Sequence, residues 1–192
     1  ESIMHMKNNN NFELSNKKIL IVGFGRIGRK LIKRCLGFEM KVYAYDPFVD
    51  QRIIESFGGI KVDDLNKSLK EIDILSLSVP LTEKTHNMIN LEKMKIMKKS
   101  AVIINTSRGG VVNERDLNEA LNNKIIYGAG LDVFEKEPPT NANPLLTNEN
   151  VLLSPHAATF TEECLSKMSI ETVQNIINFF ENKLDKSMIV KL

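Results

Sequence analysis

The chain has 192 residues, 42% of them hydrophobic and 26% charged, which is the balance of an ordinary globular protein with one domain and some additional chain. Its 26 basic and 24 acidic residues leave a formal charge of +2, too small and too dispersed to indicate a nucleic-acid or membrane partner. Cys35 and Cys164 lie outside any metal-ligand cluster, and neither a bilayer-spanning stretch nor a signal-peptide pattern occurs, so we expect two reduced core cysteines, no metal site, a cytoplasmic location and a small-molecule ligand.

Along the chain, a polar tract comes first and a periodic pattern follows it. Residues 7–11 are KNNNN, so we expect the first dozen residues to be loosely ordered or a linker. From Lys18 onward, apolar runs rich in Ile and Val alternate with segments of helical period, which is typical of an α/β protein with a parallel sheet covered on both faces. We expect six strands, each too apolar to be half-exposed, at 18–22, 41–45, 73–78, 101–105, 126–131 and 150–154.

Three segments show the helical period most clearly. Apolar residues recur on one face of 26–36 and of 113–121, which we expect to be crossover helices. The last segment carries an apolar stripe through 165–180 and is preceded by Thr159 and Glu162 in capping-box spacing. We therefore expect a long C-terminal helix whose apolar face covers another part of the protein.

A glycine-rich turn, VGFGRIG, follows the first expected strand and places Gly23, Gly25 and Gly28 in a GxGxxG pattern where a helix begins. In dinucleotide-binding folds the first glycine makes the turn, the second lets backbone approach a pyrophosphate, and the third lets the helix pack on the strand. The amide groups at the helix start then face the negative charge. The pattern alone could be only a flexible turn, but its place between a strand and a helix favours a dinucleotide site.

Asp46 ends the second expected strand, within the span of about 20 residues after the glycines at which a carboxylate accepts hydrogen bonds from ribose hydroxyls. The same charge would repel the 2′-phosphate of NADP, and Pro47, Phe48 and Val49 offer no cation to offset that repulsion. An aspartate before proline could be only a turn residue. Together with the glycines, however, Asp46 indicates NAD as the cofactor.

Three polar residues, Arg108, Glu137 and His156, occur where expected strands end, which is where ligands bind in open parallel sheets. Arg108 could hold a substrate carboxylate through two hydrogen bonds. His156 could carry the proton that accompanies hydride transfer, because an imidazole ordinarily titrates near neutral pH. Glu137 lies in the long proline-containing loop and could orient His156, with Glu135 as an alternative. Each could singly be an ordinary loop residue, but their order and context favour catalysis.

Six motifs, in this order, resemble the D-isomer-specific 2-hydroxyacid dehydrogenase family across about 13–182: VGFGRIG, YDPF, SVPLTEKTHNMIN, INTSRGGVVNERDL, GAGLDVFEKEP and LLSPHAA. The resemblance implies a Rossmann fold with a doubly wound parallel sheet, NAD as cofactor, and oxidoreduction of D-2-hydroxy acids and 2-oxo acids. YDPF looks more like the phosphoglycerate and hydroxypyruvate or glyoxylate branch than the lactate or formate branches. The resemblance also implies a homodimer formed by the nucleotide domains.

Individual roles follow from the same resemblance. Arg108 would bind the substrate carboxylate and carbonyl, Glu137 would partner His156, and His156 would be the general acid/base. Asp132 would contact the nicotinamide carboxamide, although it could be only a buried capping aspartate. The residues Ser78 to Leu81 would pass beside the cofactor, and the expected cofactor contacts are Gly23, Gly25, Arg26, Ile27, Gly28, Asp46, Val79, Pro80, Thr82, Thr106, Asp132 and His156.

Members of the resembled family begin with a substrate domain and return to it at the C-terminus. Against that pattern, we expect 1–12 to be a linker or the stub of an interdomain helix, and 13–160 to be the NAD-binding Rossmann domain. Residues 161–192 would contain a helix that belongs to an otherwise missing substrate domain, so its apolar stripe would favour self-association. We expect such a chain to bind NADH but to reduce 2-oxo acids poorly.

A second possibility is a non-enzymatic NAD(H)-sensing module with the same fold. Such a sensor needs the glycines and Asp46 but has no chemical use for Arg108, Glu137 and His156 together. The presence of all three favours the enzyme.

Overall fold

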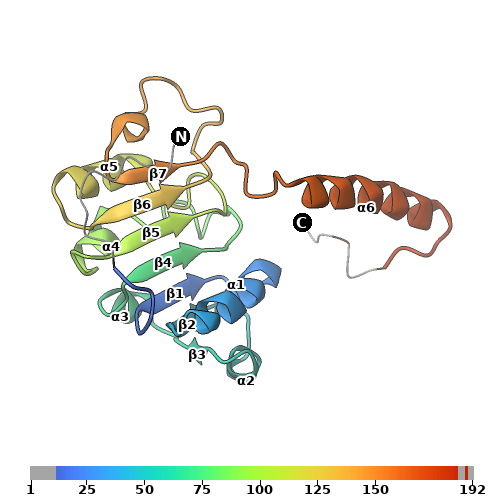
Figure 1. Cartoon of the computed structure of the whole chain (residues 1–192), viewed down its shortest axis with the longest axis horizontal. Coiled ribbons are helices and arrows are strands. Elements are labelled where there is room, and N and C mark those ends of the chain that lie inside the picture. Colours follow the sequence, from blue (N-terminus) through green and yellow to red (C-terminus); the bar gives the residue numbers. More distant parts are fainter. Residues whose placement is uncertain (1–11, 186–188, 190–192) are drawn as a thin grey trace. The chain divides into compact units, whose positions relative to one another are not determined.

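A single seven-stranded parallel sheet organises most of the chain in this computed structural model, which describes residues 12–185 and 189. The strand order is β3-β2-β1-β4-β5-β6-β7, which contains the 3-2-1-4-5-6 order of a Rossmann fold (Figure 1). The strands are β1 (Lys18–Val22), β2 (Lys41–Tyr45), β3 (Ile60–Lys61), β4 (Ile74–Leu77), β5 (Val102–Asn105), β6 (Gly128–Leu131) and β7 (Val151–Leu153).

Helices cover both faces of this sheet. On one face, α1 and α2 contribute Ile32, Cys35 and Ile54 to a core that also contains Ile19 and Ile21 of β1. On the other face, the residues of α3, α4 and α5 pack with the alternate residues of β1, β4 and β5. The helices are α1 (Arg26–Gly37), α2 (Gln51–Ser56), α3 (Leu65–Leu69), α4 (Leu91–Lys95), α5 (Glu114–Asn122), the 3-10 turn η1 (Pro144–Thr147) and α6 (Glu162–Phe180).

The strand pattern read from the sequence is confirmed, because each of the six expected runs contains a strand of the sheet. β3 was not expected: with two residues, it is too short to show a hydrophobic period. The short helices α2, α3 and α4 were also missed, although each begins after an Asp or Asn whose side chain accepts a backbone N–H. Such capping residues were the available signal.

Three sequence-based expectations are wrong in detail. β7 is an edge strand, so Leu152 is 56% exposed although the strands were expected to be fully buried. Cys164 lies on α6 and is only partly buried, whereas Cys35 is a core residue as expected. The N-cap of α6 is Thr161, whose Oγ1 accepts the N–H of Cys164 at 3.1 Å, rather than Thr159.

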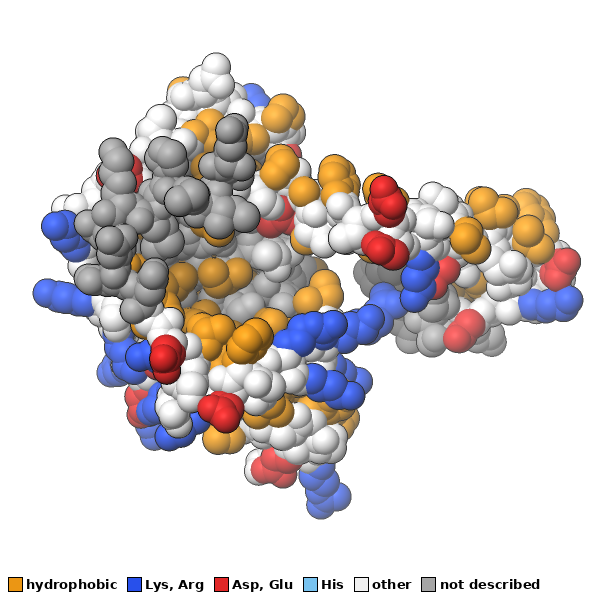
Figure 2. Space-filling view, viewed as in Figure 1, with side chains coloured by type: hydrophobic (Ala, Val, Ile, Leu, Met, Phe, Trp, Pro, Cys, Tyr) orange, Lys and Arg blue, Asp and Glu red, His pale blue; other side chains and the backbone are white. Residues whose placement is uncertain are grey.

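The chain divides into two compact units between His156 and Ala157, while the sequence placed the boundary after residue 160. The second unit contains α6, none of whose residues is buried. Hydrophobic side chains gather along this helix (Figure 2), with exposed fractions from 42% at Ile177 to 77% at Phe180. Assignment of this unit to a substrate domain stays a prediction. Among the described residues, no helix combines the length and apolar character needed to cross a membrane.

At the amino end of the sheet, Asp73 joins three segments. Its Oδ2 accepts the Lys18 N–H at 2.8 Å, and its Oδ1 accepts from Lys98 Nζ at 2.8 Å. Burial raises the pKa of Asp73, but the hydrogen bonds from Lys18 and Lys98 outweigh burial, so the pKa is lowered overall. The folded state therefore prefers the ionised carboxylate.

We predict that Asp73→Asn lowers the free energy of unfolding at pH 7 by about 1–2 kcal/mol, because a charged acceptor is lost. A lowered pKa contributes stability above the unfolded pKa of about 3.9, and this contribution disappears as the pH falls through the folded value. The difference between variant and wild type should therefore shrink below pH ~4. Urea unfolding at several pH values measures it. Glu92→Gln, which removes an exposed carboxylate paired with Lys95, is the control, and an equal loss in both variants would contradict the role of Asp73.

Candidate active site

The candidate site follows the edge of the sheet at which the parallel strands end. Because all neighbouring strands are parallel, the residues that follow each strand share this edge. In the order of the sheet, the expected site residues there are Asp46 after β2, Gly23 after β1, Val79 after β4, Thr106 and Arg108 after β5, Asp132 after β6 and His156 after β7.

The three glycines of the turn between β1 and α1 have different surroundings. Gly23 has a φ of +94°, and a Cβ there would lie 2.4 Å from the carbonyl oxygen of Ser78. A Cβ on Gly28 would lie 2.4 Å from the carbonyl oxygen of Gly23. At Gly25, by contrast, a Cβ would meet no atom of the chain within 4 Å. The first and third glycines are therefore required by packing within the chain, while the second borders open space through which a ligand can approach.

The start of α1 suits an anion. Gly25 is the N-cap and supplies no side-chain cap, and the first turn contains no acidic residue. The backbone N–H groups at the helix start are thus not offset by a carboxylate and carry the positive end of the helix dipole. Arg26 and Ile27 lie exposed in this first turn. The turn and the helix start together fit the pyrophosphate of a dinucleotide.

Asp46 lies directly beside the glycine turn. Its Oδ2 accepts the N–H of Phe24 at 2.8 Å, and its Oδ1 accepts the N–H of Phe48 at 2.9 Å. The Gly23 N–H also donates to the carbonyl oxygen of Tyr45 at 2.9 Å. The glycine turn and the carboxylate at the end of β2 are therefore adjacent. A single adenosine moiety can contact both only if they lie this close together.

The segment after β4 borders the same turn. The space that a Cβ on Gly23 would need is occupied by Ser78 and by Val79 Cγ1, the latter 2.9 Å from the Cβ position. Pro80 and Thr82 follow on the surface. The hydroxyl of Thr82 lies 3.0 Å from Thr85 Oγ1 within a local turn. Val79 is thus part of the glycine-turn packing, whereas Thr82 already has a partner inside its own turn.

The turn after β5 is organised by Asn105, which is 2% exposed. Asn105 Oδ1 accepts the backbone N–H and the hydroxyl of Ser107, at 3.0 and 2.8 Å, and its Nδ2 donates to the carbonyl oxygen of Arg108 at 3.0 Å. Arg108 and Thr106 are both exposed on this turn. Nη1 of Arg108 donates to the Ser107 carbonyl at 2.7 Å. The buried amide therefore fixes the backbone from which Arg108 projects.

His156 and Glu137 form a hydrogen-bonded pair, with Nδ1 2.8 Å from Oε2. The other carboxylate oxygen, Oε1, accepts the N–H of Phe134 at 3.0 Å. The hydrogen bond from His156 lowers the pKa of Glu137, and the Phe134 N–H and the charge of Arg108 lower it further. Because a carboxylate only accepts, the imidazole donates from Nδ1 and Nε2 is left to exchange protons with a ligand. Glu137, and not Glu135, is the partner of His156.

A cavity of about 420 Å³ borders this pair. Arg108 and the glycine turn are not among its lining residues. Its walls are mostly apolar, and they are formed by Phe134, Glu137, Pro138, Pro139, Leu146, Leu153, Ser154, Pro155 and His156.

Asp132 is 4% exposed and follows β6. Its backbone N–H donates to the Asn105 carbonyl at 3.0 Å, and its carboxylate accepts the hydroxyl of Ser154. Asp132 is therefore held between the ends of β5 and β7. Its burial agrees with a capping aspartate, and its place at the sheet edge agrees with a cofactor contact.

Sequence reasoning missed several residues that shape the site. The buried Asn105 is the partner of the Arg108 turn, and the exposed Ser154 is the partner of Asp132. Gly109 has no room for a side chain, since a Cβ would lie 1.7 Å from the Phe134 carbonyl oxygen. Glu114 contacts the loop that carries Glu137. The glycine pair after Arg108 was a visible signal, but contacts between distant loops have no local signature.

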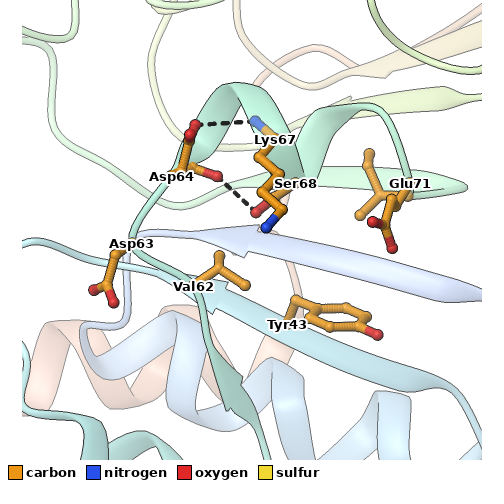
Figure 3. Close-up of a pocket in the computed structure, with 8 residues that line it drawn as sticks. Tyr43, Val62, Asp63, Asp64, Lys67, Ser68 and Glu71 are labelled. Carbon is orange, nitrogen blue, oxygen red and sulfur yellow. Dashed lines mark hydrogen bonds between the residues drawn. The ribbon is translucent and has the colours of Figure 1, made fainter.

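A second cavity lies away from the expected site residues. Its volume is about 360 Å³ and it lies between β2 and α3, and Figure 3 shows Tyr43 and Val62 beneath the side chains of α3. Asp64 caps this helix by accepting from the Lys67 N–H and, through its carbonyl, from the Ser68 hydroxyl. No expected catalytic or cofactor residue lines it. Within the described part of the chain, no three His, Cys, Asp or Glu residues are grouped as for a metal ion.

Comparison with known proteins places this geometry in a family. The model of the D-isomer specific 2-hydroxyacid dehydrogenase NAD binding domain matches residues 2–158. The chain is 40% identical over 177 residues to D-3-phosphoglycerate dehydrogenase of Methanocaldococcus jannaschii, covering 92% of this chain and 34% of that protein. It is 40% identical over 178 residues to glyoxylate reductase of Korarchaeum cryptofilum, covering 93% and 53%.

A solved structure gives the same result. The NAD complex of a D-isomer specific 2-hydroxyacid dehydrogenase from Lactobacillus delbrueckii ssp. bulgaricus superposes with a TM-score of 0.82 at 30% identity, covering 94% of this chain and 57% of that one. The chain thus spans between about a third and about half of the length of the two curated relatives. The chain belongs to the D-isomer-specific 2-hydroxyacid dehydrogenase family and contains its NAD-binding domain.

Proposed function

We propose that this chain acts as the cofactor-binding portion of an NAD-dependent oxidoreductase that interconverts D-2-hydroxy acids and 2-oxo acids. The observation that carries the proposal is the contact of 2.8 Å between His156 and Glu137, at the same sheet edge as Arg108 and the glycine turn. A proton-transfer pair, a carboxylate-binding cation and a dinucleotide turn are the three groups that such a reaction needs.

In this proposal, Arg108 binds the substrate carboxylate and lies near the reacting carbonyl. Its guanidinium can donate two parallel hydrogen bonds, a geometry that a lysine does not provide. His156 gives a proton to the carbonyl oxygen during reduction and takes it from the hydroxyl during oxidation, through Nε2. Glu137 holds the ring in the tautomer with Nδ1 protonated and stabilises the imidazolium when it forms.

NAD, when bound, supplies the hydride donor or acceptor of this reaction. Gly25 and the first turn of α1, with Arg26 and Ile27, would hold the pyrophosphate, and Asp46 would accept from the ribose hydroxyls. Asp132 would contact the nicotinamide carboxamide. Further cofactor contacts would come from Gly23, Gly28, Val79, Pro80, Thr82, Thr106 and His156.

Relatives named D-3-phosphoglycerate dehydrogenase and glyoxylate reductase support a substrate of the phosphoglycerate or hydroxypyruvate/glyoxylate type. We further propose a homodimer and a cytoplasmic location. A non-enzymatic NAD(H)-sensing module is the alternative, and the contact between His156 and Glu137 favours the enzyme because a sensor has no use for a proton-transfer pair.

We predict that the purified chain binds NADH, and that Asp46→Ala weakens this binding by about 10- to 100-fold, as expected for lost hydrogen bonds to a charged group. Binding of NADPH should weaken far less, because the variant also loses the charge that repels the 2′-phosphate. Fluorescence titration with both nucleotides measures these affinities. Glu13→Gln, which changes an exposed carboxylate before β1, serves as the control. Equal losses for NADH and NADPH would contradict recognition of the ribose hydroxyls by Asp46 and would leave only its contacts with the glycine turn.

The complete gene product tests the reaction itself. We expect it to reduce at least one of hydroxypyruvate, glyoxylate, phosphohydroxypyruvate or pyruvate with NADH. His156→Asn should lower kcat by about 10²- to 10⁴-fold, the usual contribution of a general acid/base. NADH binding without reduction of any of these acids would instead support the sensing module.

The 192-residue chain alone should behave differently. We predict that it binds NADH but reduces 2-oxo acids poorly or not at all, because positioning of the carbonyl carbon and exclusion of water depend on closure of a second domain. Steady-state NADH oxidation by the purified chain, set against the complete gene product at equal concentration, measures this difference. Comparable turnover by the two proteins would show the prediction to be wrong.

A further inference from the structure

The loop that carries Glu137 is tied to the first turn of α5. Glu114 and Glu135 exchange hydrogen bonds: the Glu114 N–H donates to Glu135 Oε1 at 3.0 Å, and the Glu135 N–H donates to Glu114 Oε1. The other oxygen of Glu114, Oε2, accepts Nδ2 of Asn143 at 2.6 Å. One carboxylate therefore holds both the beginning and the end of the segment 135–143. We call these three hydrogen bonds the α5–loop bridge.

The same loop is packed against the turn that carries Arg108. A Cβ on Gly109 would lie 1.7 Å from the carbonyl oxygen of Phe134 and 2.6 Å from the Glu135 nitrogen. The two backbones are thus in direct contact, one residue after Arg108 and two to three residues before Glu137. α5 follows this turn in sequence, so the bridge and the Gly109 contact both connect the Arg108 turn to the Glu137 loop.

Glu114 is partly buried and lies near the charges of two other carboxylates. Burial raises the pKa of Glu114, and the neighbouring charges of Glu135 and Glu137 raise it further, while the Glu135 N–H and Asn143 lower it. A partly buried carboxylate beside two others is electrostatically unfavourable. Here it is retained with both oxygens engaged in hydrogen bonds, which is the arrangement expected of a group that fixes backbone.

From these contacts we infer that Glu114 is a positioning residue: it sets where Glu137 stands relative to His156 and Arg108. The inference rests on the proposed function for the meaning of that pair, but the contacts themselves do not depend on it. Phe134 links the two, since its N–H binds Glu137 Oε1 at 3.0 Å while its carbonyl lies against Gly109. Loss of the bridge should therefore move Glu137, and the displaced carboxylate should change the position of the His156 ring.

Glu114→Gln is the sharpest variant because it keeps the shape of the side chain. An amide has only one oxygen, and its NH₂ group would face a second donor at either the Glu135 N–H or Asn143 Nδ2. Glu114→Asp keeps the charge but shortens the reach by one methylene. Glu119→Gln is the matched control, because Glu119 is an exposed glutamate on the same helix and the charge change is identical.

The test uses NMR on the purified 192-residue chain. In Glu114→Gln we expect the ring ¹⁵N signals of His156, assigned with His156→Asn, to shift, and the amides of Phe134 and Glu135 to exchange with solvent about tenfold faster. NADH affinity should stay within about twofold, since most of the proposed NADH contacts follow β1, β2 and β4, away from the bridge. Glu114→Asp should give an intermediate change, and Glu119→Gln none. A purely structural role would lower the thermal midpoint without moving the His156 ring in the folded state.

Unchanged His156 ring signals and unchanged loop amides in Glu114→Gln would overturn the inference. In the complete gene product, we expect the same variant to lower kcat by about tenfold with little change in the KM for NADH. If the His156 signals shift but the complete protein has no oxidoreductase activity, the positioning role stands and the proposed function fails.

Discussion

The carboxylate of Asp46 joins the ends of two neighbouring strands, and the geometry of the nucleotide site depends on that junction. One oxygen accepts the N–H of Phe24 inside the glycine turn and the other accepts the N–H of Phe48. The turn itself is tight because Gly23 is packed against Ser78 and Gly28 against Gly23. These contacts fix the amide groups at the start of α1 before any ligand arrives, so binding does not have to order them.

The parallel sheet also positions the other residues of the candidate site. Each strand ends at one edge, so the residues that follow β2, β1, β4, β5, β6 and β7 form a continuous row. The nucleotide-binding end of this row is built from backbone and one carboxylate. The other end is built from loops, where the buried side chain of Asn105 orients the Arg108 turn and Phe134 orients Glu137. A dinucleotide that lies along this edge would therefore extend from Asp46 toward His156 and Glu137.

Local sequence patterns predicted the elements whose formation depends on neighbouring residues. The apolar runs gave the strands, and the spacing of Gly23, Gly25 and Gly28 gave the tight turn between β1 and α1, because both follow from backbone period and glycine geometry. Local sequence pattern could not choose between Glu135 and Glu137, since both lie in one loop. The family resemblance indicated Glu137, and the fold brings Glu137 to His156. The hydrogen bond between Glu114 and Asn143 joins residues 29 positions apart, and no periodic pattern in the sequence predicts it. The two-residue β3 was missed for the simpler reason that a strand so short shows no alternation.

The contact of Gly109 with the Phe134 carbonyl also constrains how this protein can change over evolutionary time. Any substitution of a glycine adds at least a Cβ atom. At Gly109 this Cβ would lie only 1.7 Å from the Phe134 carbonyl oxygen. No rotamer relieves such an overlap, because the Cβ position is set by the main chain. A substitution of Gly109 is therefore tolerated only if the loop at Phe134 and Glu135 moves at the same time. Two segments more than twenty residues apart in the gene must then vary together, even though only one of them carries a residue proposed to bind the substrate.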